Sequence, residues 1–165
     1  MRGRVTMVKR WIIAVMAGWM CLILAACGNQ WPQPSLEQDM DAAVKKVINS
    51  SKGTGQGTAL FRMNQVARFD WQEVYVFGPD HDAQEIQDRM GLDWKEAEEV
   101  AERDSVNLIA FVKEGKVVRY VLHPTDRGEF EDLNAPRNPG TAVFISEKQK
   151  NGKWFIKPVN PGGHE

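Results

Sequence analysis

Cysteine is nearly absent from this chain of 165 residues. Its two cysteines, Cys21 and Cys27, both lie close to the N-terminus, so residues 28–165 carry no thiol. That part of the chain can form no disulfide, and it cannot use thiol catalysis, thiol redox chemistry or zinc–thiolate coordination. Its stability must therefore come from the packing of its own core.

Other signals of specific chemistry are missing as well. The three histidines, His81, His123 and His164, have no spacing typical of a metal site. No Gly-x-Ser-x-Gly sequence marks a serine nucleophile. The chain also has no basic cluster of the kind that nucleic-acid binders carry. The sequence thus predicts no metal, no cofactor and no nucleic-acid partner.

The longest apolar run is shorter than a membrane span and is placed like a signal peptide. Arg2, Arg4, Lys9 and Arg10 precede an apolar run over 11–24, whereas a spanning helix needs roughly 20 apolar residues. A basic start, an apolar middle and small residues before a cleavage site are typical of secretory signal peptides. We therefore expect residues 1–26 to be a signal peptide. An uncleaved membrane helix and cleavage without lipid attachment are the two alternatives.

The junction Leu24-Ala25-Ala26-Cys27 resembles the lipobox of bacterial lipoproteins. In that family a diacylglycerol is attached to the cysteine, which becomes the N-terminus after cleavage. The resemblance implies that Cys27 is lipidated and that the lipid bilayer is a partner. It also implies that the protein lies on the extracytoplasmic face of the cell membrane. Gly28 directly after the cysteine is similar to the pattern of sorting to an outer membrane, in cells that have one.

The chain after the predicted cleavage site has the size of one domain. Its 139 residues contain 17 basic and 22 acidic side chains, which gives a net charge of −5 with histidine neutral. Prolines and glycines gather at both of its ends. We therefore expect a lipidated tether over 27–35, a single globular domain over 36–158 and a loose tail over 159–165.

Apolar periodicity and turn residues predict the elements of this domain. Helices are expected over 35–49, 83–90 and 94–103, capped in turn by Ser35, by Asp82 and Gly91, and by Asp93. Strands are expected over 58–63, 69–77, 106–113, 116–122, 141–148 and 153–157. Glu114-Gly115 and Asn151-Gly152 are typical hairpin turns. The predicted fold class is α+β, with a single antiparallel sheet of about six strands and two or three helices on one face.

One strand carries an aromatic motif. Phe69-Asp70-Trp71, a spacer, then Val74-Tyr75-Val76-Phe77 and Pro79 are similar to a motif of small uncharacterised bacterial exported proteins and lipoproteins. The resemblance implies no activity. We expect Trp71, Tyr75 and Phe77 to belong to the core, because large aromatic side chains dominate cores.

The longest connection, 123–140, has two interpretations. A connection of this length without regular structure is either functional or merely mobile. If it binds a partner, the candidates are Asp126, Arg127, Phe130 and Arg137, since arginine and aromatic residues are enriched at binding hot spots.

These observations favour a non-catalytic binding or interaction module of the cell envelope. Its partner would be an envelope protein or a wall component. An envelope hydrolase that uses His81 or loop carboxylates as acid and base is the first alternative. An inhibitor of an exported enzyme is the second.

Overall fold

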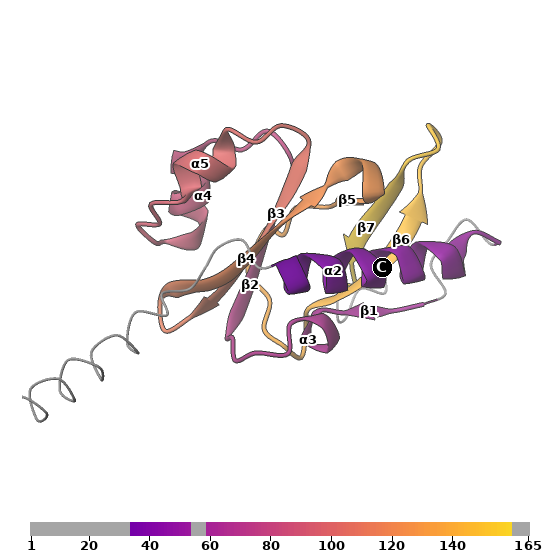
Figure 1. The fold of residues 1–165 in the computed structure, drawn as a ribbon, viewed down its shortest axis with the longest axis horizontal. Coiled ribbons are helices and arrows are strands. Elements are labelled where there is room, and N and C mark those ends of the chain that lie inside the picture. The colour runs from indigo at the N-terminus through magenta and orange to yellow at the C-terminus, as the bar shows by residue number, and fades with distance from the viewer. Residues whose placement is uncertain (1–33, 54–58, 160–165) are drawn as a thin grey trace, which may run out of the picture. The chain divides into compact units, whose positions relative to one another are not determined.

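The computed structural model describes residues 34–53 and 59–159 (Figure 1). The predicted signal peptide, Cys27, most of the tether and nearly all of the predicted tail lie outside these residues. The described part is an α+β fold, as the sequence predicts. Within it, no helix is long and apolar enough to cross a membrane.

The elements follow one another along the chain in the order helix, strand, helix, strand, two helices, then mostly strands. The helices are α2 (Pro34–Ser51), α3 (Met63–Val66), α4 (Ala83–Met90), α5 (Ala97–Ala101) and a 3₁₀ turn, η2 (Thr125–Arg127). The strands are β1 (Phe61–Arg62), β2 (Glu73–Phe77), β3 (Val106–Lys113), β4 (Lys116–Pro124), β5 (Glu129–Phe130), β6 (Val143–Lys148) and β7 (Trp154–Pro158).

The strands form two sheets, so the single six-stranded sheet was a wrong prediction. β2, β3 and β4 pair in that order, and all three are antiparallel to their neighbours. The second sheet has the order β1-β6-β7-β5, in which β5 runs parallel to β7. The physical reason lies in the chain after β4, which leaves the first sheet and adds β5 to the second. The two predicted hairpins, β3–β4 and β6–β7, therefore never become neighbours.

Layers cover both faces of the three-stranded sheet, whereas the sequence prediction placed helices on one face only. Successive residues of β3 point to opposite faces, as in any strand. Ile109 and Phe111 belong to a core shared with α2 and the second sheet. Leu108 and Ala110 belong to a second core under α4 and α5. Figure 1 shows α4 and α5 together on one side of β2–β4, away from α2.

The predicted hairpins are confirmed. β3 has the predicted bounds, and its turn places both Glu114 (φ 51°) and Gly115 (φ 68°) in the left-handed region. This is the backbone of a two-residue hairpin turn whose twist matches the strands. The second hairpin turns at Asn151-Gly152, where Gly152 has a φ of 87°.

The three predicted helices are present, but α2 begins at Pro34, so Ser35 lies inside this helix and is not its N-terminal cap. α2 buries an apolar stripe that includes Met40 and Val44. α4 is capped by the Asp82 carboxylate, which accepts from the Glu85 amide, and ends at left-handed Gly91. α5 is shorter than predicted, and its N-cap residue is Glu96 rather than the predicted Asp93; the Glu96 side chain makes no capping hydrogen bond.

The first two strand predictions were too long. The chain forms only a two-residue strand at Phe61–Arg62 before it turns into α3, and β2 begins at Glu73 rather than at residue 69. Trp71 and Phe77 are nevertheless buried, as predicted, while Tyr75 is only half-buried. The aromatic motif therefore serves the core.

Candidate functional site

The connection 123–140 is held in place by a buried amide. Asn107 on β3 is fully buried, and its Nδ2 donates to the carbonyl oxygens of His123 (3.0 Å) and Gly128 (3.3 Å). Its Oδ1 accepts from the amide of Phe130 at 3.0 Å. One side chain thus satisfies three buried backbone groups and fixes the chain from the end of β4 to β5.

The second half of the connection runs beside β2. The amide of Leu133 donates to the carbonyl of Val76, and Val74 and Arg137 exchange backbone hydrogen bonds in both directions. The amide of Glu131 donates to the carbonyl of Ile156 on β7. The interpretation of 123–140 as a plain mobile loop is therefore wrong, because its backbone is bonded to both sheets.

The four predicted binding residues of this connection are not brought together. Phe130 is 1% exposed and packs against Phe61 and Phe144, so its assignment as a surface contact was wrong. The Arg137 guanidinium donates to the carbonyls of Thr141 and Val159. Its side chain is therefore engaged in hydrogen bonds within the protein. Asp126 and Arg127 remain exposed, and both line a large concave surface of the described part of the chain.

This concave surface, which we call the α2–η2 groove, has a volume of about 880 Å³. It lies between the C-terminal half of α2, η2 and the turn of the β6–β7 hairpin, elements that Figure 1 shows around the same space. α2 contributes Asp41, Lys45, Ile48 and Asn49 to its lining, and Lys52 contributes from just beyond the end of this helix. The opposite wall consists of residues 125–128, and the hairpin adds Asn151, Lys153 and Trp154.

Charges line the groove with an excess of basic groups. Asp41 and Arg127 form an ion pair of 3.1 Å across it. Asp41 and Lys45 have the i,i+4 spacing of a helical ion pair, but Asp41 bonds to Arg127. Lys45 is exposed and, like Lys52, has no ion-pair partner among the described residues. Lys153 lies 4.0 Å from Glu129, at the limit of an ion pair.

His123 is buried close to this ion pair. It is 2% exposed on β4, packs edge-on against Phe130, and its Nε2 has no hydrogen-bond partner among the described residues. Burial lowers the pKa of His123 to about 4, an effect that Arg127 reinforces and that Asp41 and Asp126 oppose. The imidazole is therefore neutral at neutral pH.

A second polar cluster surrounds Asp132. His81 Nε2 lies 2.7 Å and Arg89 Nη1 3.0 Å from Asp132 Oδ2, while the amide of Gly78 donates to Oδ1. Burial by itself raises the pKa of Asp132, but the donors from Gly78, Arg89 and His81 together outweigh it and lower the pKa. Sequence reasoning missed this cluster because 51 residues separate His81 from Asp132.

The Asp132 cluster holds two parts of the chain together and leaves little space for a ligand. Glu85 Oε1 lies 2.9 Å from His81 Nδ1, yet out of line for a hydrogen bond, so that nitrogen is buried without a bonded partner among the described residues. The cavity beside His81 has a volume of about 20 Å³, which holds a single water and no substrate. Asp132 thus ties the connection 123–140 to the turn before α4.

Neither cluster has the ligands for a metal ion. Within 34–53 and 59–159, no three histidine, cysteine, aspartate or glutamate side chains converge closely enough to hold one.

Comparison with known proteins gives no relative. No family model, no curated protein and no solved structure matches the chain.

We expect the protein to lose stability as the pH falls from about 6.5 to about 4. The ordinary pKa of His123 is 6.5, and burial lowers it to about 4 in the folded protein. In this window the unfolded state binds one proton more, so the free energy of unfolding decreases with falling pH, by on the order of 3 kcal/mol. Urea unfolding at several pH values measures this dependence.

The matched variant is His123→Leu, which removes the titrating group and keeps the site apolar. It should flatten the pH dependence over the same window. An equally steep loss of stability in His123→Leu would show that other groups cause it.

Proposed function

We propose that the protein is a lipid-anchored, extracytoplasmic module of the bacterial cell envelope that binds a partner in the α2–η2 groove and catalyses nothing. The observation that carries the binding proposal is the groove itself. It has a volume of about 880 Å³, with polar groups from three elements around it. Ligand sites are typically concave surfaces of about 300–1,000 Å³ with a few convergent polar groups.

The rigidity of one wall supports this proposal. Asn107 donates to the carbonyls of His123 and Gly128 and so holds the wall segment 125–128 at both of its ends. Gly128 packs so closely on α2 that a Cβ at this position would lie 2.9 Å from Val44. A wall held in this way keeps its shape without a ligand, which lowers the entropic cost of binding.

The His81–Asp132 pair is the feature that a hydrolase would use, and its surroundings argue for a structural role. Asp132 already has three donors around it. Each ring nitrogen of His81 lies beside a carboxylate, Nδ1 beside Glu85 and Nε2 beside Asp132. A general base needs access to the proton that it abstracts. The small cavity beside His81 offers a substrate no such access.

The lipid-anchor proposal rests on the Leu24-Ala25-Ala26-Cys27 junction after a short apolar run. We expect Cys27→Ala to abolish lipid attachment, because no other cysteine follows the cleavage site. Metabolic labelling of bacterial cells with a fatty-acid analogue measures attachment. Equal label on the wild type and on Cys27→Ala would contradict the lipoprotein assignment.

The groove proposal predicts that a bulky side chain in the groove blocks capture of the partner. Asn49 is an exposed residue of α2 that lines the groove, so Asn49→Trp should fill part of it and leave the core intact. The measurement is chemical cross-linking in cells that produce the full-length chain, followed by purification and mass spectrometry. Envelope components captured by the wild type should decrease several-fold in Asn49→Trp.

The control is Ala42→Trp, at an exposed position of the same helix outside the α2–η2 groove. It should capture the same components as the wild type. Undiminished capture by a folded Asn49→Trp variant would place the binding surface elsewhere.

A further inference from the structure

We infer that the ligand of the α2–η2 groove is a linear polyanion, a chain that carries phosphate or carboxylate groups at regular intervals. This inference rests on the proposed function, because it names the chemical class of ligand that the same groove binds. Three observations carry it: the number of cations in the groove, their lack of partners and their spacing.

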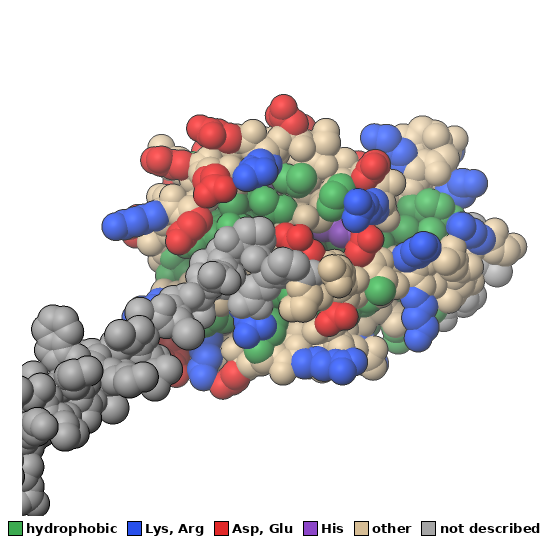
Figure 2. Space-filling view, viewed as in Figure 1, with side chains coloured by type: hydrophobic (Ala, Val, Ile, Leu, Met, Phe, Trp, Pro, Cys, Tyr) green, Lys and Arg blue, Asp and Glu red, His purple; other side chains and the backbone are tan. Residues whose placement is uncertain are grey.

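Basic side chains outnumber acidic ones in the groove although the domain as a whole is acidic. Lys45, Lys52, Arg127 and Lys153 line it, against Asp41 and Asp126. The chain from Cys27 onward has 17 basic and 22 acidic residues, so this local excess opposes the overall balance. Figure 2 shows the same separation on the visible face: Lys and Arg gather towards β6, β7 and the end of α2, whereas Asp and Glu gather over α4 and α5.

Two of these cations are free to meet a ligand. Neither Lys45 nor Lys52 forms an ion pair with a described residue, and both are exposed. Lys45 has no partner because Asp41, the acidic residue four positions before it on the helix, is paired with Arg127 instead. An ammonium group without a partner is a ready point charge for a phosphate or carboxylate oxygen.

The spacing of the cations favours a chain over a single small anion. Lys45 lies on α2 and Lys52 directly follows its last residue, Ser51, so about 9 Å of helix axis separates Lys45 from the end of the helix at which Lys52 stands. Lys153 enters from the hairpin on another side of the groove. No single phosphate can reach cations that lie so far apart, whereas successive groups of one chain can.

The concave shape argues against a flat anionic membrane surface as the ligand. The cations line a hollow of about 880 Å³ rather than a protruding surface. The net negative charge of the domain would also be repelled by a layer of anionic lipid. A flexible polyanion can enter the groove without approaching the acidic part of the surface.

The test is calorimetric titration of the full-length chain, purified in neutral detergent, with three probes. These are linear polyphosphate, poly-glutamate and inorganic phosphate. We expect at least one of the two polymers to bind, more weakly at high salt, and inorganic phosphate at equal total phosphate to bind far more weakly. The polymer that binds identifies the anionic group.

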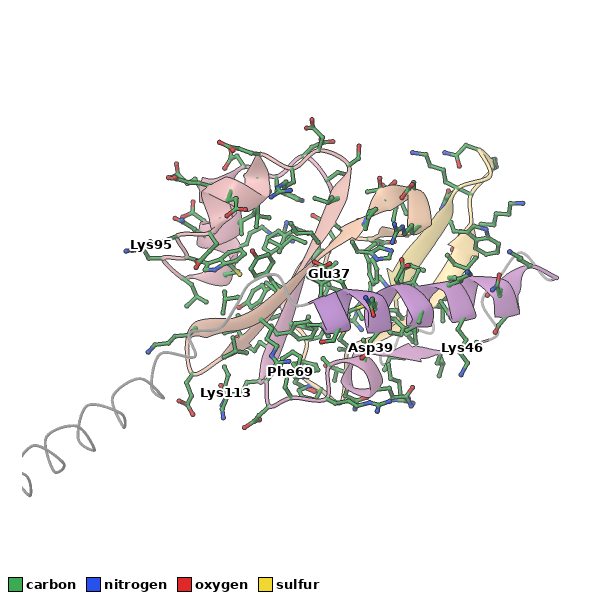
Figure 3. The ribbon with its side chains drawn as sticks, viewed as in Figure 1. Glu37, Asp39, Lys46, Phe69, Lys95 and Lys113 are labelled. Carbon is green, nitrogen blue, oxygen red and sulfur yellow. The ribbon has the colours of Figure 1, made fainter. Side chains whose placement is uncertain are left out.

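Charge reversal localises the binding. Lys45→Glu with Lys52→Glu should weaken polymer binding at least about tenfold, because two attractions become repulsions. The control, Lys46→Glu with Lys95→Glu, changes the net charge equally at two exposed lysines outside the groove. Figure 3 shows Lys46 below α2 in this view and Lys95 beside α4 and α5. Its affinity should stay within about twofold of the wild type.

Three results would overturn the inference: no binding of either polymer, inorganic phosphate bound as tightly as the polymers, or equal weakening by both pairs of substitutions. If the inference failed in one of these ways and Asn49→Trp still blocked capture in cells, only the class of ligand would be wrong. Loss of the effect of Asn49→Trp would instead contradict the proposed function.

Discussion

A buried side-chain amide joins the two sheets of this protein. Asn107 is buried on the central strand β3 and bonds to three backbone groups, those of His123 in β4, Gly128, and Phe130 in β5. Each of these groups would cost about 1–3 kcal/mol if it were buried without a partner. The position of β5, and with it the way the second sheet begins, therefore depends on an amide at position 107.

The groove is a consequence of the same arrangement. Asn107 fixes the two ends of the segment that contains η2, and Gly128 allows that segment to approach α2 closely. Arg127 is thereby brought to Asp41, which leaves Lys45 without a partner. A buried polar contact thus contributes to the arrangement of charges in the groove. The binding function that we propose depends on this link between the interior and the groove.

Local patterns predicted the local structure well and the long-range structure poorly. The apolar stripe of α2, the Asp82 and Gly91 caps of α4 and the β3–β4 turn all depend on residues close in sequence, and each was predicted. The division into two sheets depends on where the chain goes after residue 123, which no periodicity encodes. Phe130 was misplaced for this reason: within an irregular segment nothing distinguishes a buried aromatic residue from an exposed one. The contact of His81 with Asp132 was missed because it joins distant parts of the chain.

The claim that 123–140 is a fixed connection between the sheets is tested most directly by amide hydrogen exchange in the native protein. The amides of Phe130, Glu131, Leu133 and Arg137 donate to Asn107 and to carbonyls of β7 and β2. They should therefore exchange about as slowly as the amides in the middle of β3, because they open only with the sheets. Exchange of these four amides at the rate of an exposed loop would contradict the account.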